Sequence, residues 1–288
     1  MHGNQLKWIY LSMLSLIWGS SFILIKKGLI ALSPLQLGSL RIIFAALFLL
    51  LIGFRSLKNI PKTKWKYIAL TSLFGTFIPA FLFAIAQQHI SSVISSVINS
   101  LTPVNTLLLG VLLFGAAFKR MQIIGVSIGL IGCLILILNG ATAQTSQNYG
   151  YAGLVVIASI CYAVNVNLIK KYLHNLSPLS ISTGNFCVLL LPATCILFCT
   201  NFFDSILNHE MQVASLYIMI LGVIGTGLAN IIFFKLIQIS SPVFATSVTY
   251  LIPVVAFSWG FADGESLTNS QILGAFVILI GVYLSSKK

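Results

Sequence analysis

The sequence predicts an all-α integral membrane protein whose ten transmembrane helices form two inverted five-helix repeats. Composition, the spacing of apolar runs and an internal duplication support this prediction. Of the 288 residues, 58% are hydrophobic and only 7% are charged, whereas soluble domains usually have about 25% charged residues. The chain therefore lacks the polar surface of a water-soluble globule, and this leaves a polytopic membrane protein.

Ten apolar runs are long enough to cross a bilayer as helices, because a helical span takes about 20 residues. Strands are excluded, since lipid offers no partner for an unpaired backbone. The first run has no small-residue cleavage site and is followed by Lys26 and Lys27, which predicts an uncleaved span. The predicted spans are residues 9–25, 34–54, 66–88, 92–114, 121–138, 151–169, 178–200, 213–234, 242–261 and 269–286.

The charges predict the orientation of these spans. With a cytoplasmic N-terminus, thirteen of the sixteen basic residues fall in inner loops and tails, and only Lys26 and Lys27 fall outside. Cytoplasmic loops carry such an excess of Lys and Arg, so both termini are expected in the cytoplasm. The inner basic residues are Lys7, Arg55, Lys58, Lys62, Lys64, Lys66, Lys119, Arg120, Lys170, Lys171, Lys235, Lys287 and Lys288. The four acids, Asp204, Glu210, Asp263 and Glu265, all fall outside.

The two halves of the chain carry a repeated motif. Residues 24–35 (LIKKGLIALSPL) and 168–179 (LIKKYLHNLSPL) are identical at nine of twelve positions, 144 residues apart. Pro103-Val104 and Pro253-Val254 continue the match at an offset of 150. An internal repeat of this length indicates a duplicated structural unit.

Each repeat holds five predicted spans, and an odd number makes the second copy enter the membrane from the opposite side. The predicted domains are residues 1–144 and 145–288, joined by the uncharged linker 139–150. Inverted repeats of this kind occur in secondary transporters, where two related halves rock around a site near the bilayer midplane.

The sequence resembles the drug/metabolite transporter superfamily, EamA type. The resemblance rests on WGSSF at 18–22, on Arg41, on the prolines within spans and on GESLTNSQILGAFVILIGV at 264–282. One departure is Gly115-Ala116, where many relatives have Gly-Glu; the second half keeps Gly264-Glu265. The resemblance implies a secondary transporter, an exporter or exchanger, of small metabolites such as amino acids in the bacterial cytoplasmic (inner) membrane.

Arg41 is the only charged side chain placed well inside a predicted span. Ionisable groups within a membrane are costly and mark candidate functional sites. A guanidinium binds a carboxylate through two parallel hydrogen bonds, so Arg41 is a candidate anchor for an anionic group. The alternative is an arginine that packs between helices and binds backbone carbonyls. Asn185 stands at the equivalent position of the second repeat.

Amides and aromatic residues extend the candidate site. Amides within spans either line a hydrated cavity or hydrogen-bond neighbouring helices; here they are Gln87, Gln88, Asn99, Asn105, Asn165, Asn167 and Asn230. Trp18, Tyr162 and Tyr250 could supply apolar walls with polar tips. The predicted substrate-binding residues are Trp18, Ser21, Arg41, Gln87, Asn99, Asn105, Tyr162, Asn165, Asn230 and Tyr250.

Four prolines, Pro79, Pro103, Pro192 and Pro253, fall within predicted spans. A proline frees a backbone carbonyl and bends its helix, either as a static kink or as a flexible point. Pro103 and Pro253 are repeat counterparts and are the predicted gating residues. Gly125-x-x-x-Gly129 is a candidate for close helix packing.

Other classes of function lack their signatures. No carboxylate lies inside a predicted span, which argues against an embedded proton relay and against cationic drugs as main substrates. No phosphate-binding G-x-x-x-x-G-K-[ST] loop occurs, so the chain is not expected to hydrolyse ATP itself. The five cysteines form no metal-ligand pattern and are expected to pack. We therefore expect no enzyme activity, no cofactor, no metal and no nucleic-acid partner; the partners are a small metabolite and the bilayer. An intramembrane enzyme would need a catalytic dyad or acid cluster at one depth of the membrane, and a receptor would have no evident use for the inverted duplication. The alternative substrate class is a nucleotide sugar or phosphate ester, which would need several basic residues within the membrane.

Overall fold

The computed structural model describes residues 2–90, 92–117, 119–138, 149–204, 208–262 and 269–285. Every regular element in these ranges is helical, and no strand occurs among them. The all-α prediction is confirmed for this part of the chain. The linker predicted at 139–150 falls largely outside these ranges, as do Gly264-Glu265.

The first half begins with two long helices and continues through shorter pieces. Its elements are α1 (His2–Gly28), α2 (Pro34–Gly53), the 3₁₀ turns η1 (Phe54–Asn59) and η2 (Lys62–Lys64), α3 (Trp65–Ser72), the π-helical η3 (Leu73–Phe77), α4 (Ile78–Ala86), α5 (Ser92–Asn99), α6 (Thr102–Phe114) and α7 (Arg120–Leu138).

The second half repeats this order from a short turn onward. Its elements are the 3₁₀ turn η4 (Tyr149–Tyr151), α8 (Ala152–Leu168), the π-helical η5 (Ile169–Leu173), α9 (Pro178–Phe198), α10 (His209–Ile220), the π-helical η6 (Leu221–Leu228), α11 (Ala229–Ile239), α12 (Pro242–Thr246), α13 (Val248–Ala262) and α14 (Asn269–Ser285).

The duplicated LSPL block starts a helix in each half. Ser33 accepts a hydrogen bond from the backbone of Gln36 and caps α2, while Ser177 caps α9 in the same way. A proline follows each serine at the first helical position, where its missing N–H costs nothing. The repeated sequence therefore corresponds to a repeated structure, the capped start of a helix.

Six of the described helical stretches are long and apolar enough to cross a membrane. They are Gln5–Gly28, Pro34–Asn59, Lys62–Ala86, Ala152–Leu173, Pro178–Phe198 and His209–Ile239. Shorter apolar helices cover Thr102–Phe114, Arg120–Gly132, Pro242–Val255 and Ile272–Ser285. These lengths and compositions describe a multi-pass membrane protein.

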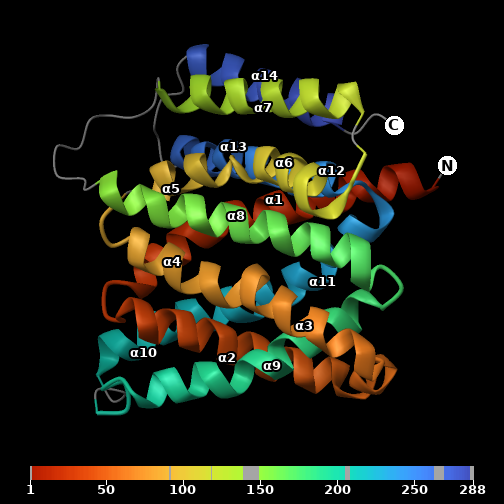
Figure 1. Ribbon diagram of the computed structural model, residues 1–288. Coiled ribbons are helices and arrows are strands. Elements are labelled where there is room, and N and C mark those ends of the chain that lie inside the picture. The colour runs from red at the N-terminus through yellow and green to blue at the C-terminus, as the bar shows by residue number, and fades with distance from the viewer. Residues whose placement is uncertain are drawn as a thin grey trace.

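The helices lie roughly parallel or antiparallel in stacked layers (Figure 1). Helices α7 and α14 form one edge of the molecule, and α2, α9 and α10 form the opposite edge. The start of α1 and the end of α14 lie on the same side, together with the α2–α3, α8–α9 and α11–α12 connections (Figure 1). The largest apolar core cluster includes residues of α1, α8, α11 and α13 between these two edges.

Two predicted spans are interrupted in the structure. The predicted span 92–114 breaks between α5 and α6, and the predicted span 242–261 breaks at Ser247 between α12 and α13. Pro103 and Pro253 lack the N–H that would bond to the carbonyls of Asn99 and Thr249. Hydroxyl groups bond to both carbonyls: Thr102 Oγ1 donates to Asn99 O at 2.6 Å and Ser100 Oγ donates to Thr249 O at 3.3 Å.

Glycines allow α7 and α14 to approach closely. A Cβ added at Gly132 would lie 2.7 Å from the backbone nitrogen of Ile278 and 3.0 Å from the carbonyl oxygen of Gly274. A Cβ added at Gly125 would meet the backbone of Gly281 at 2.7 Å. The expected close packing at Gly125-x-x-x-Gly129 is confirmed, and the contact joins the last helices of the two halves.

We expect Gly132→Ala to destabilise the protein, because the added methyl group meets backbone atoms that cannot rotate away. Overpacking of this kind costs roughly 1–3 kcal/mol. Gly153→Ala is the matched control, since no atom lies within 4 Å of a Cβ built at Gly153. Thermal unfolding in detergent should show a lower midpoint for Gly132→Ala only; equal midpoints would contradict the packing described here.

Candidate substrate-binding cavity

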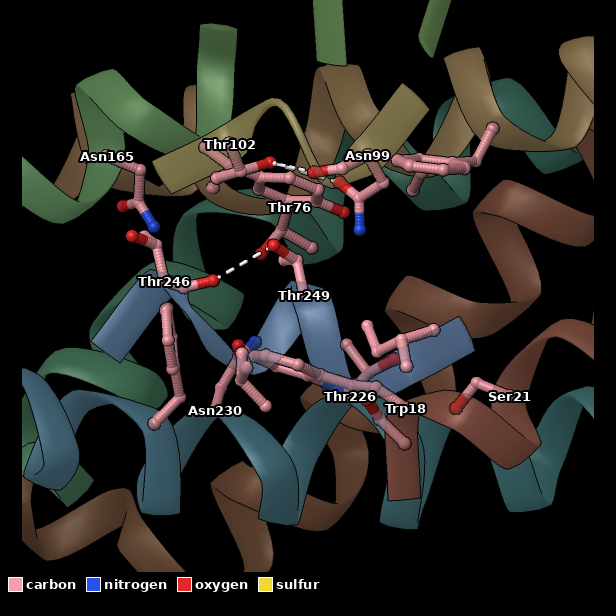
Figure 2. Close-up of a pocket in the computed structure, with 18 of the residues that line it drawn as sticks. Trp18, Ser21, Thr76, Asn99, Thr102, Asn165, Thr226, Asn230, Thr246 and Thr249 are labelled. Carbon is pink, nitrogen blue, oxygen red and sulfur yellow. Dashed lines mark hydrogen bonds between the residues drawn. The ribbon is translucent and has the colours of Figure 1, made fainter. Parts of the chain in front are cut away.

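A cavity lies between the two halves and holds about 880 Å³ of atom-free space, part of which is open to the surroundings. The first half contributes α1, α2, η3, α4, α5 and α6, and the second contributes α8, η6, α11, α12 and α13. Figure 2 shows Asn99, Thr102 and Asn165 on one side of the cavity and Trp18, Ser21 and Asn230 on the other.

Arg41 is held at the cavity wall by one hydrogen bond. Its Nε donates to Thr226 Oγ1 at 2.7 Å, and Thr226 Oγ1 donates in turn to the carbonyl of Leu221 at 3.0 Å. Among the described residues, none accepts a hydrogen bond from the two terminal nitrogens of Arg41, and no Asp or Glu lines the cavity. The guanidinium therefore keeps free the two nitrogens that bind a carboxylate bidentately.

The π-helical segment η6 (Leu221–Leu228) explains this arrangement. A π-helix shifts the backbone bonding by one residue and leaves carbonyls for other partners. Leu221 O accepts from the Thr226 hydroxyl, and Gly225 O accepts from Trp18 Nε1 at 2.9 Å. The irregular backbone of η6 thus fixes both the arginine and the tryptophan.

Aromatic rings form the apolar walls. Trp18 and Phe233 meet edge to face with ring centroids 5.0 Å apart, and Phe83 stacks on Tyr162 at 6.1 Å. All four residues line the cavity. Such walls bind the apolar part of a small molecule, while the amides and hydroxyls between them orient its polar groups.

Asn165 packs directly on Gly75 of η3. A Cβ added at Gly75 would lie 2.6 Å from the Asn165 amide carbon, so any larger residue would displace the amide. Asn165 is 3% exposed, and its Oδ1 makes no hydrogen bond in the described part of the chain. A buried acceptor without a partner is a costly feature that points to a role in binding or in another conformation.

Seven of the ten predicted substrate-binding residues line this one cavity: Trp18, Ser21, Arg41, Asn99, Tyr162, Asn165 and Asn230. The other predicted residues are placed elsewhere. Asn105 Nδ2 donates to Ser159 Oγ at 2.8 Å and joins α6 to α8. Gln87 ends α4 and accepts from Ser92 Oγ at 3.2 Å. Their contacts are those of residues that connect structural elements.

Tyr250 also lies outside the cavity. It is completely buried, and its hydroxyl donates to the carbonyl of Val126 in α7 at 3.0 Å. Its ring covers Gly129, where an added Cβ would lie 2.7 Å from the ring. Tyr250 therefore fastens α13 to α7.

The two predicted gating prolines are buried beside the cavity but do not line it. Pro103 stands in the first turn of α6, immediately after the helix break, whereas Pro253 stands inside α13. Pro103 is thus part of a helix start and does not kink a continuous helix. The gating role of both residues stays a prediction.

Sequence reasoning missed the threonines of the site. Thr76, Thr102, Thr226, Thr246 and Thr249 all line the cavity. Threonine is too common in membrane helices to stand out by itself. One available signal was the Gly-Thr dipeptide at 75–76 and 225–226, which recurs at the offset of 150 that relates Pro103 to Pro253.

The helical membrane fold and the cavity between two related halves define a membrane transporter by architecture. The chain matches the EamA-like transporter family over residues 6–138 and again over residues 150–287. It therefore belongs to the EamA-like transporter family, and the predicted resemblance is confirmed.

Full-length relatives agree with this assignment. An uncharacterized transporter of Archaeoglobus fulgidus is 25% identical, over 98% of this chain and 99% of its own. A "probable amino-acid metabolite efflux pump" of Salmonella typhimurium is 27% identical, over 93% and 91%. The uncharacterized inner membrane transporter YedA of Escherichia coli is 27% identical, over 94% and 87%. A crystal structure with 15% identity superposes with a TM-score of 0.72, covering 96% of this chain and 95% of that one, and shows the same fold.

We expect Tyr250→Phe to lower the thermal stability while leaving ligand binding and transport unchanged. Losing the hydrogen bond to Val126 costs about 0.5–1.5 kcal/mol, and the cavity wall is not touched. Thermal unfolding and uptake measured on the same preparation test this. A variant of normal stability with impaired transport would place Tyr250 back in the site.

Proposed function

We propose that this transporter is a secondary exporter of small metabolites that carry one carboxylate, such as amino acids. The observation that carries the proposal is Arg41, a single cation whose terminal nitrogens are free at a cavity lined from both halves of the chain. The efflux-pump name of the Salmonella relative supports both the substrate class and the direction.

In this proposal the substrate carboxylate binds the two terminal nitrogens of Arg41. The amides and hydroxyls around the cavity bind its remaining polar groups, and Trp18, Phe83 and Phe233 cover its apolar part. Nucleotide sugars and phosphate esters carry two or more negative charges and would need further cations. Among the described residues that line the cavity, Arg41 is the only basic one.

We further propose that the chain crosses the bacterial cytoplasmic membrane ten times, as two inverted repeats, with both termini in the cytoplasm. The two separate family matches support domains close to the predicted 1–144 and 145–288. The shared side of the start of α1 and the end of α14 fits an even number of crossings (Figure 1). Transport then proceeds by alternating access, in which the halves rock around the cavity.

A thermal-shift screen of carboxylates and their decarboxylated or amidated analogues identifies the ligand, because a molecule that binds the folded state stabilises it. Arg41→Ala should then raise the dissociation constant of the best carboxylate at least about tenfold, since it removes a charge pair worth roughly 2–5 kcal/mol. Arg41→Lys should recover only part of the affinity, because an ammonium lacks the two-pronged geometry.

Thr226 provides a second, independent test of the same site. Thr226→Val removes the acceptor that holds Arg41 Nε and should weaken carboxylate binding by at least about tenfold, the effect of one hydrogen bond to a charged group. Thr226→Ser should bind normally. Thr194→Val is the control, because the Thr194 hydroxyl donates to the carbonyl of Leu190 within α9 and Thr194 does not line the cavity. Stable variants at 41 and 226 with unchanged affinity would overturn the proposed site.

The orientation is tested by cysteine labelling in a cysteine-free background with a reagent that does not cross membranes. His209→Cys and Thr145→Cys should react from outside the cell, whereas Lys58→Cys and His174→Cys should react only after the cytoplasmic side is exposed. The positive-inside distribution is the physical reason. Labelling of position 145 from the cytoplasmic side would contradict both the orientation and the inverted repeat.

A further inference from the structure

The second copy of the duplicated LIKK motif connects two helices at the end of the molecule that carries the start of α1. Lys170, in η5 at the end of α8, donates from its Nζ to the carbonyls of Ile237 at 3.0 Å, Gln238 at 3.3 Å and Ser240 at 2.7 Å. These carbonyls lie at the C-terminal end of α11, where a helix leaves acceptors without internal partners and carries partial negative charge. One ammonium group therefore fastens α8 to the end of α11.

A second bond joins the same elements. Gln238 Nε2 donates to the carbonyl of Leu176, in the turn between α8 and α9, at 2.7 Å. Leu176 belongs to the duplicated block 168–179. The end of α11 is thus held to the end of α8 and its following turn by two side chains, one contributed from each side.

The repeat counterparts of these residues lie at the opposite end of the molecule and make no such bonds. Lys170 corresponds to Lys26 at an offset of 144, and Gln238 corresponds to Gln88 at an offset of 150. Lys26 and Gln88 are both exposed, and neither side chain hydrogen-bonds to any residue that the structure describes. The pair of helices that matches α8 and α11 is α1 and α4.

The two ends of the molecule differ in the bonds of Lys170 and Gln238, but the lysines next to Lys170 and Lys26 make contacts at both ends. The neighbouring lysines are engaged at both ends: Lys171 Nζ donates to the carbonyl of Phe114 at 3.0 Å, and Lys27 lies 5.1 Å from the ring centre of Tyr217. Gly28, at the end of α1, packs against Ile218 of α10. The α1 end is therefore well packed on α10, and only the connection to α4 lacks its counterpart of the Lys170 and Gln238 bonds.

We propose that Lys170 with Gln238, and Lys26 with Gln88, are two alternating latches of the transport cycle. In the present structure the Lys170 latch is closed and holds the cytoplasmic end shut between α8 and α11. Both partners of the Lys170 latch belong to the second half, so the latch opens when α8 and α11 separate within that half. In that conformation Lys26 binds the carbonyls at the end of α4 while Gln88 binds the carbonyl of Leu32, the counterpart of Leu176. This inference rests on the proposed function, because it assigns the two ends to the two sides of the membrane.

The chemistry suits a reversible contact. A lysine bonded to backbone carbonyls makes no salt bridge, so opening leaves no buried acid behind. The ammonium and the carbonyls lie at the helix ends, where water can replace each bond, and the net contribution of such bonds is modest. Each latch can therefore bias the equilibrium between two conformations without locking it.

The test measures access to the cavity from each side of the membrane and needs no substrate. Thr249→Cys places one thiol in the cavity wall of the full-length, cysteine-free protein in oriented vesicles, where an impermeant thiol reagent is added from either side. Lys170→Met should raise the labelling rate from the side of the termini and lower it from the other. The ratio should change at least about tenfold, because the loss of even one of the three hydrogen bonds of the ammonium has an effect of this size. Lys26→Met should change the ratio in the opposite direction.

Matched variants separate the latch from general effects of charge or stability. Gln238→Leu should act like Lys170→Met and Gln88→Leu like Lys26→Met, whereas Lys58→Met and Lys27→Met should leave the ratio unchanged. The Lys26→Met, Lys170→Met double variant should return towards the parent ratio. If both single variants change the ratio in the same direction, or neither differs from its control, the latches are refuted while the proposed transport function stands. If the thiol can be labelled from one side only in every variant, alternating access itself fails.

Discussion

The structure depends on one constraint: inside a lipid bilayer, every backbone N–H and C=O must find a partner within the protein. Continuous helices meet it automatically, but this chain interrupts its helices at η3, at η6 and at the two breaks beside Asn99 and Ser247. At each break a side chain bonds to a carbonyl that the adjacent proline frees, and within η6 Trp18 and Thr226 do the same for Gly225 and Leu221. The same interruptions line the cavity. Polar side chains within the membrane thus support the irregular backbone and at the same time line the cavity.

This constraint also decides how much the sequence could predict. The helical structure, the spans that begin at residues 34 and 178, and the family all followed from apolar length, the quoted motifs and the duplication, whereas the caps at Ser33 and Ser177 were found only in the structure. The helix breaks did not, because a proline within an apolar run is compatible with a kink, a helix start or a full interruption. Pro103 and Pro253 match in sequence, yet one begins α6 and the other lies inside α13. The position of each proline relative to the helix break separates these outcomes: Pro103 follows the break before α6 directly, whereas Pro253 lies six residues after Ser247.

The sequence indicated which polar residues lie within the helical spans, but it did not indicate which of them face the cavity. Asn99 and Asn105 are six residues apart in one predicted span, and a continuous helix would relate them by a fixed rotation. The break between α5 and α6 removes that relation, so Asn99 lines the cavity while Asn105 bonds to Ser159. Tyr250 was predicted to bind substrate, but its hydroxyl binds the carbonyl of Val126 in α7 and the residue does not line the cavity. Residue type indicates that a polar group needs a partner and leaves open whether the partner is another helix or a ligand.

The two halves share the same irregular backbone segments and differ in the side chains at equivalent positions. Both have a π-helical segment with a Gly-Thr pair, yet only Thr226 bonds to an arginine; Asn185, the counterpart of Arg41, is 1% exposed and lies 2.9 Å from Thr71 Oγ1. This asymmetry has a physical reason. Asn185 bonds to Thr71 and does not line the cavity, so only Arg41 of this pair does; a second guanidinium beside it would repel it strongly where the dielectric constant is low. One arginine avoids that repulsion, and a substrate with one carboxylate would neutralise it, so the loaded cavity would carry less charge than the empty one. Desolvation penalises charge, and rocking around a neutralised cavity is easier than around a charged one. In the proposed transport cycle, symmetry in the backbone would serve the motion, while the single arginine at position 41 would serve binding and couple the motion to occupancy.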